Sequence, residues 1–170
     1  IESGTFDTES NYNNDIYVTG YLYMTGGDIT PNSSTISVGA TKLSGGTLTF
    51  PDASGMFTIT GATDLNALGN SGYVYYASSG TVDPQDGTVK YTGPGGKGWG
   101  YMNTNGGDFY NFTIETSSNH MSDMSFMPTQ GAYPILIENN FLINSGYPRS
   151  SSNADCWTVG GAMIVGDGVG

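Results

Sequence analysis

The chain has 170 residues and a formal net charge of −11 at pH 7, with four basic residues against fifteen acidic ones. Nucleic acid and anionic membrane surfaces are poor partners for such a chain, because binding them requires clustered lysine or arginine. Charged residues make up only 11% of the chain and glycine contributes 27 residues. Together with abundant Tyr, Thr, Ser and Asn, this composition predicts a folded all-β protein with a hydroxyl- and amide-rich surface.

Strand signals follow one another along the chain, whereas helix signals are almost absent. Each predicted strand is short, rich in β-branched or aromatic residues, and bounded by turn residues. Besides the repeated units described next, the predicted strands are 34–38, 47–50, 56–60, 73–76, 88–91, 108–114 and 124–127. One turn at 64–68 is the only helical candidate, and its sequence fits a loop equally well.

A twelve-residue unit occurs three times, at 16–27, 135–146 and 157–168, and the three copies align without gaps. The fifth position is small or polar and the last is glycine. The first, third, seventh and ninth positions are apolar: Ile16, Val18, Leu22, Met24; Ile135, Ile137, Phe141, Ile143; Trp157, Val159, Met163, Val165. This pattern predicts two short strands with these side chains inward, a break between the strands, and a turn after them.

The beginning and the end of the chain resemble each other as blocks, over 3–27 and 145–168. Such blocks are expected in a slice of a longer tandem array, or in subunits that stack head to tail. The chain begins with Ile1 rather than Met and contains no apolar run long enough to cross a membrane. We therefore expect a processed protein or a fragment, with a single repeat domain over 1–170.

Four short phrases carry a family resemblance: SGT (3–5), YVTGYLYM (17–24), SGGTLTF (44–50) and GGDFYNFTI (106–114). They are similar to the Gly-, Thr- and Asn-rich β-solenoid repeats of large bacterial and archaeal surface proteins. The resemblance implies a right-handed parallel β-helix in an adhesin, stalk or fibre, usually without catalysis. The chain departs from that pattern at Tyr21, Tyr23 and Phe141, and by an insert over 93–107.

The predicted fold is thus an all-β, irregular right-handed parallel β-helix or solenoid. A two-sheet β-sandwich or jelly roll is the alternative, because strands spaced roughly 8–12 residues apart fit both architectures. The gapless repeat favours the solenoid, since a sandwich does not require one.

Histidine and cysteine occur once each, as His120 and Cys156. One of each cannot supply a zinc site, and no GxSxG motif accompanies the histidine. We expect His120 in an exposed loop and Cys156 buried beside Trp157. Neither residue predicts an enzyme.

Asp83 and Asp86, in VDPQDG, are the closest carboxylate pair whose spacing suits catalysis. Two such groups can cleave a glycosidic bond, but DPQDG is also a good turn sequence, and we favour the turn. Binding of calcium is a more plausible role for the acidic residues than catalysis, because carboxylate oxygens in Gly-rich turns suit this ion. The candidate calcium ligands are Asp7, Asp15, Asp83, Asp86, Asp155 and Asp167.

Two sequons for N-glycosylation begin at Asn32 and Asn111. The first lies in a PNSS turn, which is the better exposed position. The second lies inside a predicted strand.

Tyrosines form the last group of candidate residues. If the apolar residues of the first unit point inward, Tyr17, Tyr21 and Tyr23 point outward, and Tyr73 and Tyr75 share one face of another strand. Such rows of Tyr bind sugars or another protein surface, unless an overlying loop covers them.

These features predict a structural protein of the extracellular space, cell surface or virion surface: a fibre, stalk or filament element that associates with itself. One alternative is a glycan-binding adhesin or a viral tail or decoration module that uses the Tyr rows. Another is a polysaccharide-cleaving β-helix enzyme that uses Asp83 and Asp86. No nucleic acid, membrane insertion or cofactor other than calcium is expected.

Overall fold

The computed structural model describes residues 1–61, 73–93, 98–115, 124–128, 135–145, 147–148 and 157–166. Their regular secondary structure consists of strands, and none of these residues is helical, which confirms the all-β class. The helical turn considered at 64–68 lies outside the described residues.

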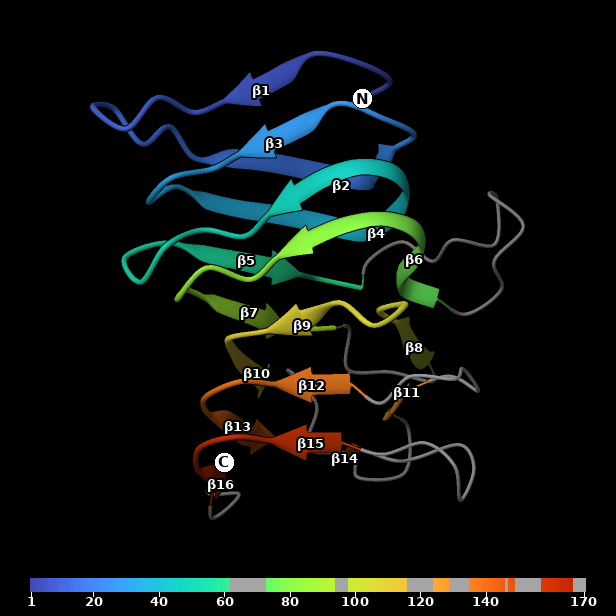
Figure 1. Cartoon of the computed structure of the whole chain (residues 1–170). Coiled ribbons are helices and arrows are strands. Elements are labelled where there is room, and N and C mark those ends of the chain that lie inside the picture. The colour runs from blue at the N-terminus through green and yellow to red at the C-terminus, as the bar shows by residue number, and fades with distance from the viewer. Residues whose placement is uncertain are drawn as a thin grey trace.

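The strands stack one above another from β1 at one end to β16 at the other (Figure 1). Every strand pairing among the described residues is parallel. The strands are β1 (Thr5–Asp7), β2 (Ile16–Met24), β3 (Asp28–Thr30), β4 (Thr35–Thr49), β5 (Met56–Ile59), β6 (Tyr73–Asp83), β7 (Thr88–Tyr91), β8 (Gly98–Asn103), β9 (Asp108–Phe109), β10 (Asn111–Glu115), β11 (Met124–Pro128), β12 (Ile135–Ile137), β13 (Phe141–Ser145), β14 (Tyr147–Pro148), β15 (Trp157–Val159) and β16 (Met163–Val165).

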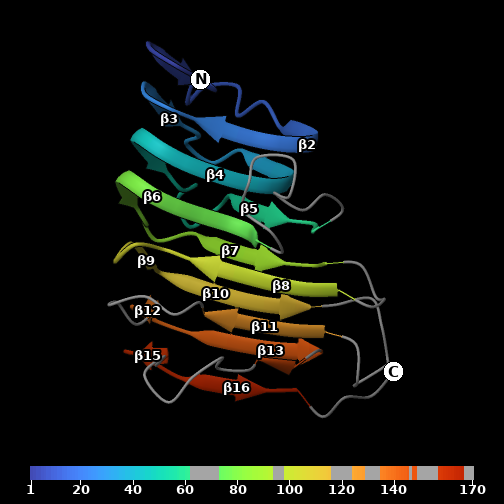
Figure 2. The same ribbon diagram turned by 90° about the vertical axis from the view of Figure 1, so that its right-hand side faces the viewer.

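The pairings arrange the strands in three columns. The first contains β1, β3 and the last parts of β4 and β6, and continues in the smaller sheet β9–β12–β15. The second runs through the first parts of β2 and β4 and then through β5, β7, β10, β13 and β16. The third runs through the later part of β2, the middle of β4, the first part of β6, and β8, β11 and β14; many of its strands face the viewer in Figure 2.

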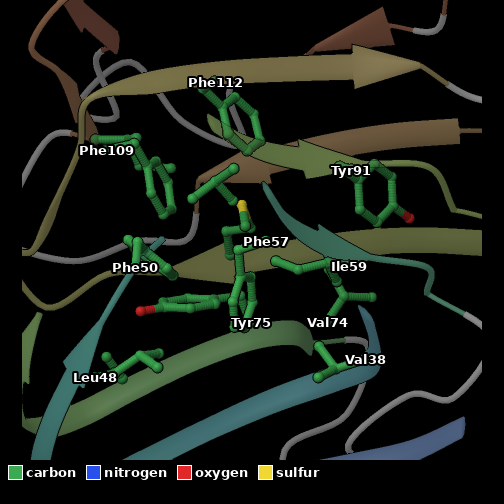
Figure 3. Close-up of a cluster of buried hydrophobic side chains, with 14 of the residues drawn as sticks. Val38, Leu48, Phe50, Phe57, Ile59, Val74, Tyr75, Tyr91, Phe109 and Phe112 are labelled. Atoms are coloured by element: carbon green, nitrogen blue, oxygen red, sulfur yellow. The ribbon is translucent and has the colours of Figure 1, made fainter. Parts of the chain in front are cut away.

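The core consists of side chains stacked along these columns. In the second column one inward row is Ile16, Ile36, Phe57, Val89, Phe112, Phe141 and Met163. Its neighbour is Val18, Val38, Ile59, Tyr91, Ile114, Ile143 and Val165. Aromatic rings fill the middle of the stack (Figure 3), where Phe109 and Phe112 stack with ring centroids 5.0 Å apart. Inward and outward residues alternate as the period of a β-strand requires.

The residues that align between the second and third sequence units are the residues that pair between neighbouring strands. Ile135 pairs with Trp157, Ile137 with Val159, and Phe141 with Met163. The first unit has the same pattern but lies one column further along: Ile16 occupies the row of Phe141, not that of Ile135. Its predicted break at Gly20 is a shift of register within a continuous strand β2, between Val18 and Tyr21.

Each predicted strand outside the repeated units is present, with three differences. The segment 108–114 is divided into β9 and β10, which belong to different sheets. The segments 34–38 and 47–50 belong largely to one strand of 15 residues, β4, and 73–76 extends as β6 to Asp83. Gly45 and Gly46 lie within β4, and the strand bends at Gly46, which has a positive φ of 79°.

Glycines with positive φ form a ladder at the entry to the first column. Gly4, Gly27, Gly46 and Gly80 have φ of 79°, 69°, 79° and 95°. They precede Thr5, Asp28, Thr47 and Thr81, which are paired in that order. The recurring SGT, GGD and GGT phrases are therefore places where the chain bends in a conformation that glycine adopts at low cost.

Candidate functional site: the two ends of the stack

Among the residues whose side-chain burial the structure describes, large exposed hydrophobic side chains lie at the two ends of the stack. We call residues 1–24 the N-terminal end surface and residues 157–166 the C-terminal end surface. Among the described residues the exposed large hydrophobics are Ile1, Phe6, Tyr12, Tyr17, Tyr23, Met163, Ile164 and Val165. None of these lies in β3 to β7, β9, β10, β12 or β13, the strands between the ends whose side-chain burial is fully described; the exposed positions there are mainly Thr, Ser, Asn, Gly and acidic residues.

At the N-terminal end surface, Phe6 belongs to an inward row of side chains but is the first residue of that row. Its register partner Ile29 and the next residue in that row, Leu48, are both buried, whereas Phe6 is 46% exposed. The difference follows from position: β1 pairs with β3 alone, so one side of Phe6 has no further strand against it.

At the C-terminal end surface the prediction that Met163 and Val165 are buried is wrong. They are 57% and 65% exposed, although their register partners Phe141 and Ile143 are buried. Their strand, β16, is the last member of the sheet path and pairs only with β13. The side chains have the inward phase of the row, but no strand of the described part of the chain lies beyond them.

The two end surfaces differ in charge. The N-terminal one carries the four acidic residues Glu2, Asp7, Glu9 and Asp15 and no basic side chain. The C-terminal one, over 157–166, contains no charged residue. Contact between opposite ends therefore brings no like charges together within these residues, whereas contact between two N-terminal ends does.

The predicted Tyr rows are partly confirmed. Tyr17 and Tyr23 are exposed and Tyr21 and Tyr73 are half-buried. Tyr75 is fully buried, so the prediction that it faces outward is wrong. A register shift between Tyr73 and Tyr75 in the β6–β8 pairing turns Tyr75 into the core.

The hydroxyl of Tyr75 is buried without a hydrogen-bond partner. Burial also raises the pKa of this phenol. Leaving such a group unpaired costs about 1–3 kcal/mol, so Tyr75→Phe is expected to raise the free energy of unfolding by that amount. Urea denaturation measures the change, with Tyr17→Phe at an exposed position as the matched control. A loss of stability in Tyr75→Phe would show that the hydroxyl is satisfied, for example by water.

Neighbouring side chains cover parts of the remaining Tyr rings. The Lys42 Nζ lies 5.2 Å from the ring centroid of Tyr23, a cation–π contact across adjacent strands. The rings of Tyr73 and Tyr76 meet edge to face at 4.9 Å. Lateral packing, one of the two expectations for these rows, therefore accounts for part of them.

Carboxylates at the turns after the first column bond to the backbone. Asp83 Oδ1 accepts from the amide of Gln85, and Asp86 Oδ1 accepts from the backbone N–H of Ala53 at 2.8 Å. These contacts support the turn that we favoured for DPQDG. Asp52, a residue the sequence analysis did not single out, does the same: hydrogen bonds from Ser33 and Ser54 lower its pKa.

Of the other candidate calcium ligands, two also accept hydrogen bonds within the fold. Asp7 Oδ1 accepts from Glu9 and Asn32, and Asp15 Oδ1 accepts from the N–H of Thr35. Asp155 and Asp167 lie outside the described residues. Within the described part of the chain, no three His, Cys, Asp or Glu residues gather as a metal site. Calcium binding stays a prediction.

Both sequon asparagines use their side-chain amides in the fold. Asn32 Nδ2 donates to Asp7 Oδ1 at 2.8 Å, and Asn111 Nδ2 donates to the Gly87 carbonyl at 3.2 Å. Asn111 Oδ1 also accepts from Asn139. A glycan on either nitrogen has to displace these contacts, and glycosylation stays untested.

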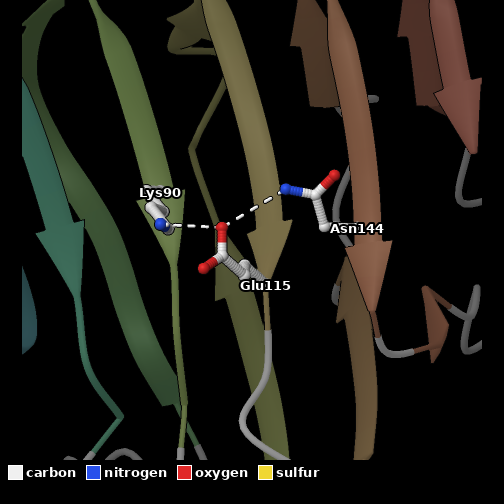
Figure 4. Close-up of polar contacts among 3 residues, drawn as sticks. All are labelled: Lys90, Glu115 and Asn144. Atoms are coloured by element: carbon white, nitrogen blue, oxygen red, sulfur yellow. Dashed lines mark hydrogen bonds and ion pairs between the residues drawn. The ribbon is translucent and has the colours of Figure 1, made fainter. Parts of the chain in front are cut away.

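One polar network lies on the outer side of the second column. Lys90 Nζ and Glu115 form an ion pair at 2.8 Å, and Asn144 Nδ2 donates to the same carboxylate at 3.3 Å (Figure 4). The hydrogen bond from Lys90, and then that from Asn144, lower the pKa of Glu115. The three residues come from neighbouring strands β7, β10 and β13, so the network ties successive strands together rather than forming a reactive group.

Two predicted features lie outside the described residues: the loop position of His120 and the burial of Cys156. In the part of the chain that is described, no helix has the length and apolar character needed to cross a membrane.

Comparisons of the chain with family models, with curated proteins and with solved structures found no match. The resemblance to Gly-, Thr- and Asn-rich surface repeats therefore remains a prediction from the four phrases that suggested it.

Proposed function

We propose that the chain is a structural element of an extracellular surface: a right-handed parallel β-solenoid that associates end to end into a fibre, stalk or filament. The solenoid is favoured over a sandwich by the exclusively parallel pairing in the described strands. Sandwiches are built from antiparallel sheets, whereas each strand here pairs with one roughly 20 to 35 residues away, a typical solenoid period. The right hand follows from the strong preference of parallel connections.

The observation that carries the function is where the exposed apolar side chains lie. A protein that binds a ligand along its length is expected to expose large side chains there. In this chain β3 to β7, β9, β10, β12 and β13, the strands between the ends whose side-chain burial is fully described, expose none, and the ends expose several. Open strand edges accompany these side chains at β1 and β16. An apolar surface next to an unpaired edge favours pairing with another strand.

Self-association is tested by light scattering and electron microscopy over a range of concentrations, with and without calcium. The wild-type chain is expected to form linear oligomers whose mean mass rises with concentration. Val165→Asp places a charge on the C-terminal end surface and is expected to raise the required concentration by at least about tenfold, because burying an unpaired charge is unfavourable. Thr58→Asp, on the outer side in the middle of the stack, is the matched control. Monomeric wild-type protein at every concentration contradicts the proposal.

A second candidate function is glycan binding, favoured by the exposure of Tyr17, which reaches 73%. Tyrosine rings stack on sugars when one face is free. This function predicts saturable binding on a glycan array that Tyr17→Ala removes and Tyr75→Phe leaves intact, since Tyr75 is in the core. Binding unaffected by Tyr17→Ala would exclude this site.

A further inference from the structure

We infer that a second copy of this chain docks with its N-terminal end surface against the C-terminal end surface of the first, with β15 paired to β1 and β16 paired to the first part of β2. This inference rests on the proposed end-to-end association and specifies its polarity and register. Every strand pairing among the described residues is parallel, and the junction continues the first and second columns in the same direction.

The inward rows continue across such a junction without a change of chemistry. The second column ends in Met163 and Val165 and begins with Ile16 and Val18. Docking in register therefore places Met163 over Ile16 and Val165 over Val18. Each pair restores the neighbour that these side chains lack, since Ile16 and Val18 are only partly buried.

The first column gives an independent match. It ends in Val159, which follows Ile137 in its row, and it begins with Phe6. Both are half-buried or exposed, while the members Ile29 and Ile137 next to them are buried. One rigid placement of the second copy sets β16 on β2 and β15 on β1 at the same time. This is because β15 and β16 are the last strands of their two columns, and β1 and β2 are the first.

The outward row of the second column identifies the register most sharply. It begins with Tyr17 and ends with Ile164, which are 73% and 50% exposed. Between them the row contains mostly polar residues: Ser37, Thr58, Lys90, Thr113 and Leu142. A parallel junction brings Ile164 of one copy beside Tyr17 of the next, and an aromatic and a β-branched side chain stabilise each other when they are cross-strand neighbours.

The junction joins different surfaces, so it is heterologous and does not close on itself as a two-fold dimer does. Repetition of one heterologous contact produces an open chain unless its rotation closes a ring. The charge distribution favours the same polarity, because the uncharged C-terminal end surface meets the acidic N-terminal one.

The test uses single-cysteine variants in a Cys156→Ala background. Ile164→Cys and Tyr17→Cys are mixed at a concentration where the Cys156→Ala parent associates, then oxidised, and the disulfides are mapped by mass spectrometry. Neighbouring strands hold Cα atoms at a distance that permits a disulfide. The expected product is the mixed dimer, at least about tenfold above the product of Ile164→Cys with Tyr23→Cys, an exposed residue on another side of the same end. Circular dichroism checks that each variant keeps its strands.

Three outcomes overturn the inference. Strong disulfide formation in either variant alone shows that like ends meet. Efficient coupling of Ile164→Cys to Tyr23→Cys shows another register. Absence of the mixed dimer while the parent still associates by light scattering shows that copies dock elsewhere. If the parent stays monomeric throughout, the proposed end-to-end association fails as well, and the ends are covered by something other than a second copy.

Discussion

Replacing Phe112 by alanine is expected to lower the free energy of unfolding by about 3–5 kcal/mol, the range for truncating a buried aromatic side chain. Phe112 is fully buried and its ring stacks on Phe109 and lies 5.8 Å from Phe141 and 6.1 Å from Trp157, centroid to centroid. These rings come from different strands, so a cavity at this position removes contacts between successive layers. Urea denaturation followed by tryptophan fluorescence and by circular dichroism measures the loss.

Phe6→Ala is the matched control, because the same atoms are removed from the same kind of inward row. Phe6 is half exposed at the end of the stack, so the loss in dilute monomeric protein is expected to stay within about 1 kcal/mol. Equal losses for Phe6→Ala and Phe112→Ala would contradict the description of Phe6 as uncovered. In associated protein the Phe6→Ala loss is expected to grow, since docking covers that ring.

Much of the fold could be predicted from the sequence because strand burial has a period of two. The apolar positions of the second and third units alternate strictly, and their gapless alignment is the observed register of Ile135 with Trp157. The first unit shows where pattern reasoning stops. The same alternation fits any column, and only the lengths of the turns decide that Ile16 stands in the row of Phe141.

The candidate surfaces were harder to predict, for two physical reasons. A register shift in β6 turns Tyr75 inward, and nothing in the letters YVYY marks such a shift. Exposure of Met163 and Val165 depends on whether another strand lies beyond β16, which is a property of the stack and not of the unit. In contrast, the turn at Asp83 and Asp86 was predicted correctly, because the preference of a turn for Pro and Gly at given positions depends only on residues adjacent in the sequence.

Gly46→Ala is expected to lower the free energy of unfolding by about 2–5 kcal/mol, because backbone strain and steric displacement add. Gly46 has a φ of 79°, a conformation that costs an L side chain energy. A Cβ there would also overlap the carbonyl oxygen of Gly27, which accepts the hydrogen bond from Thr47 at 2.9 Å. The glycine ladder repeats a close approach of this kind at Gly27, where a Cβ would overlap the carbonyl oxygen of Gly4. Thermal and urea denaturation measure the effect.

Gly20→Ala separates this cause from a general intolerance of side chains on glycines. Gly20 lies in β2, and a Cβ at this position meets no heavy atom within 4 Å. The substitution is expected to be neutral or to stabilise by about 0.4–1 kcal/mol, by restricting the unfolded chain. A Gly46→Ala variant as stable as Gly20→Ala would mean that the bend in β4 does not require glycine. The ladder would then be a feature of composition only, and the SGT and GGT phrases would carry no information about where the chain turns.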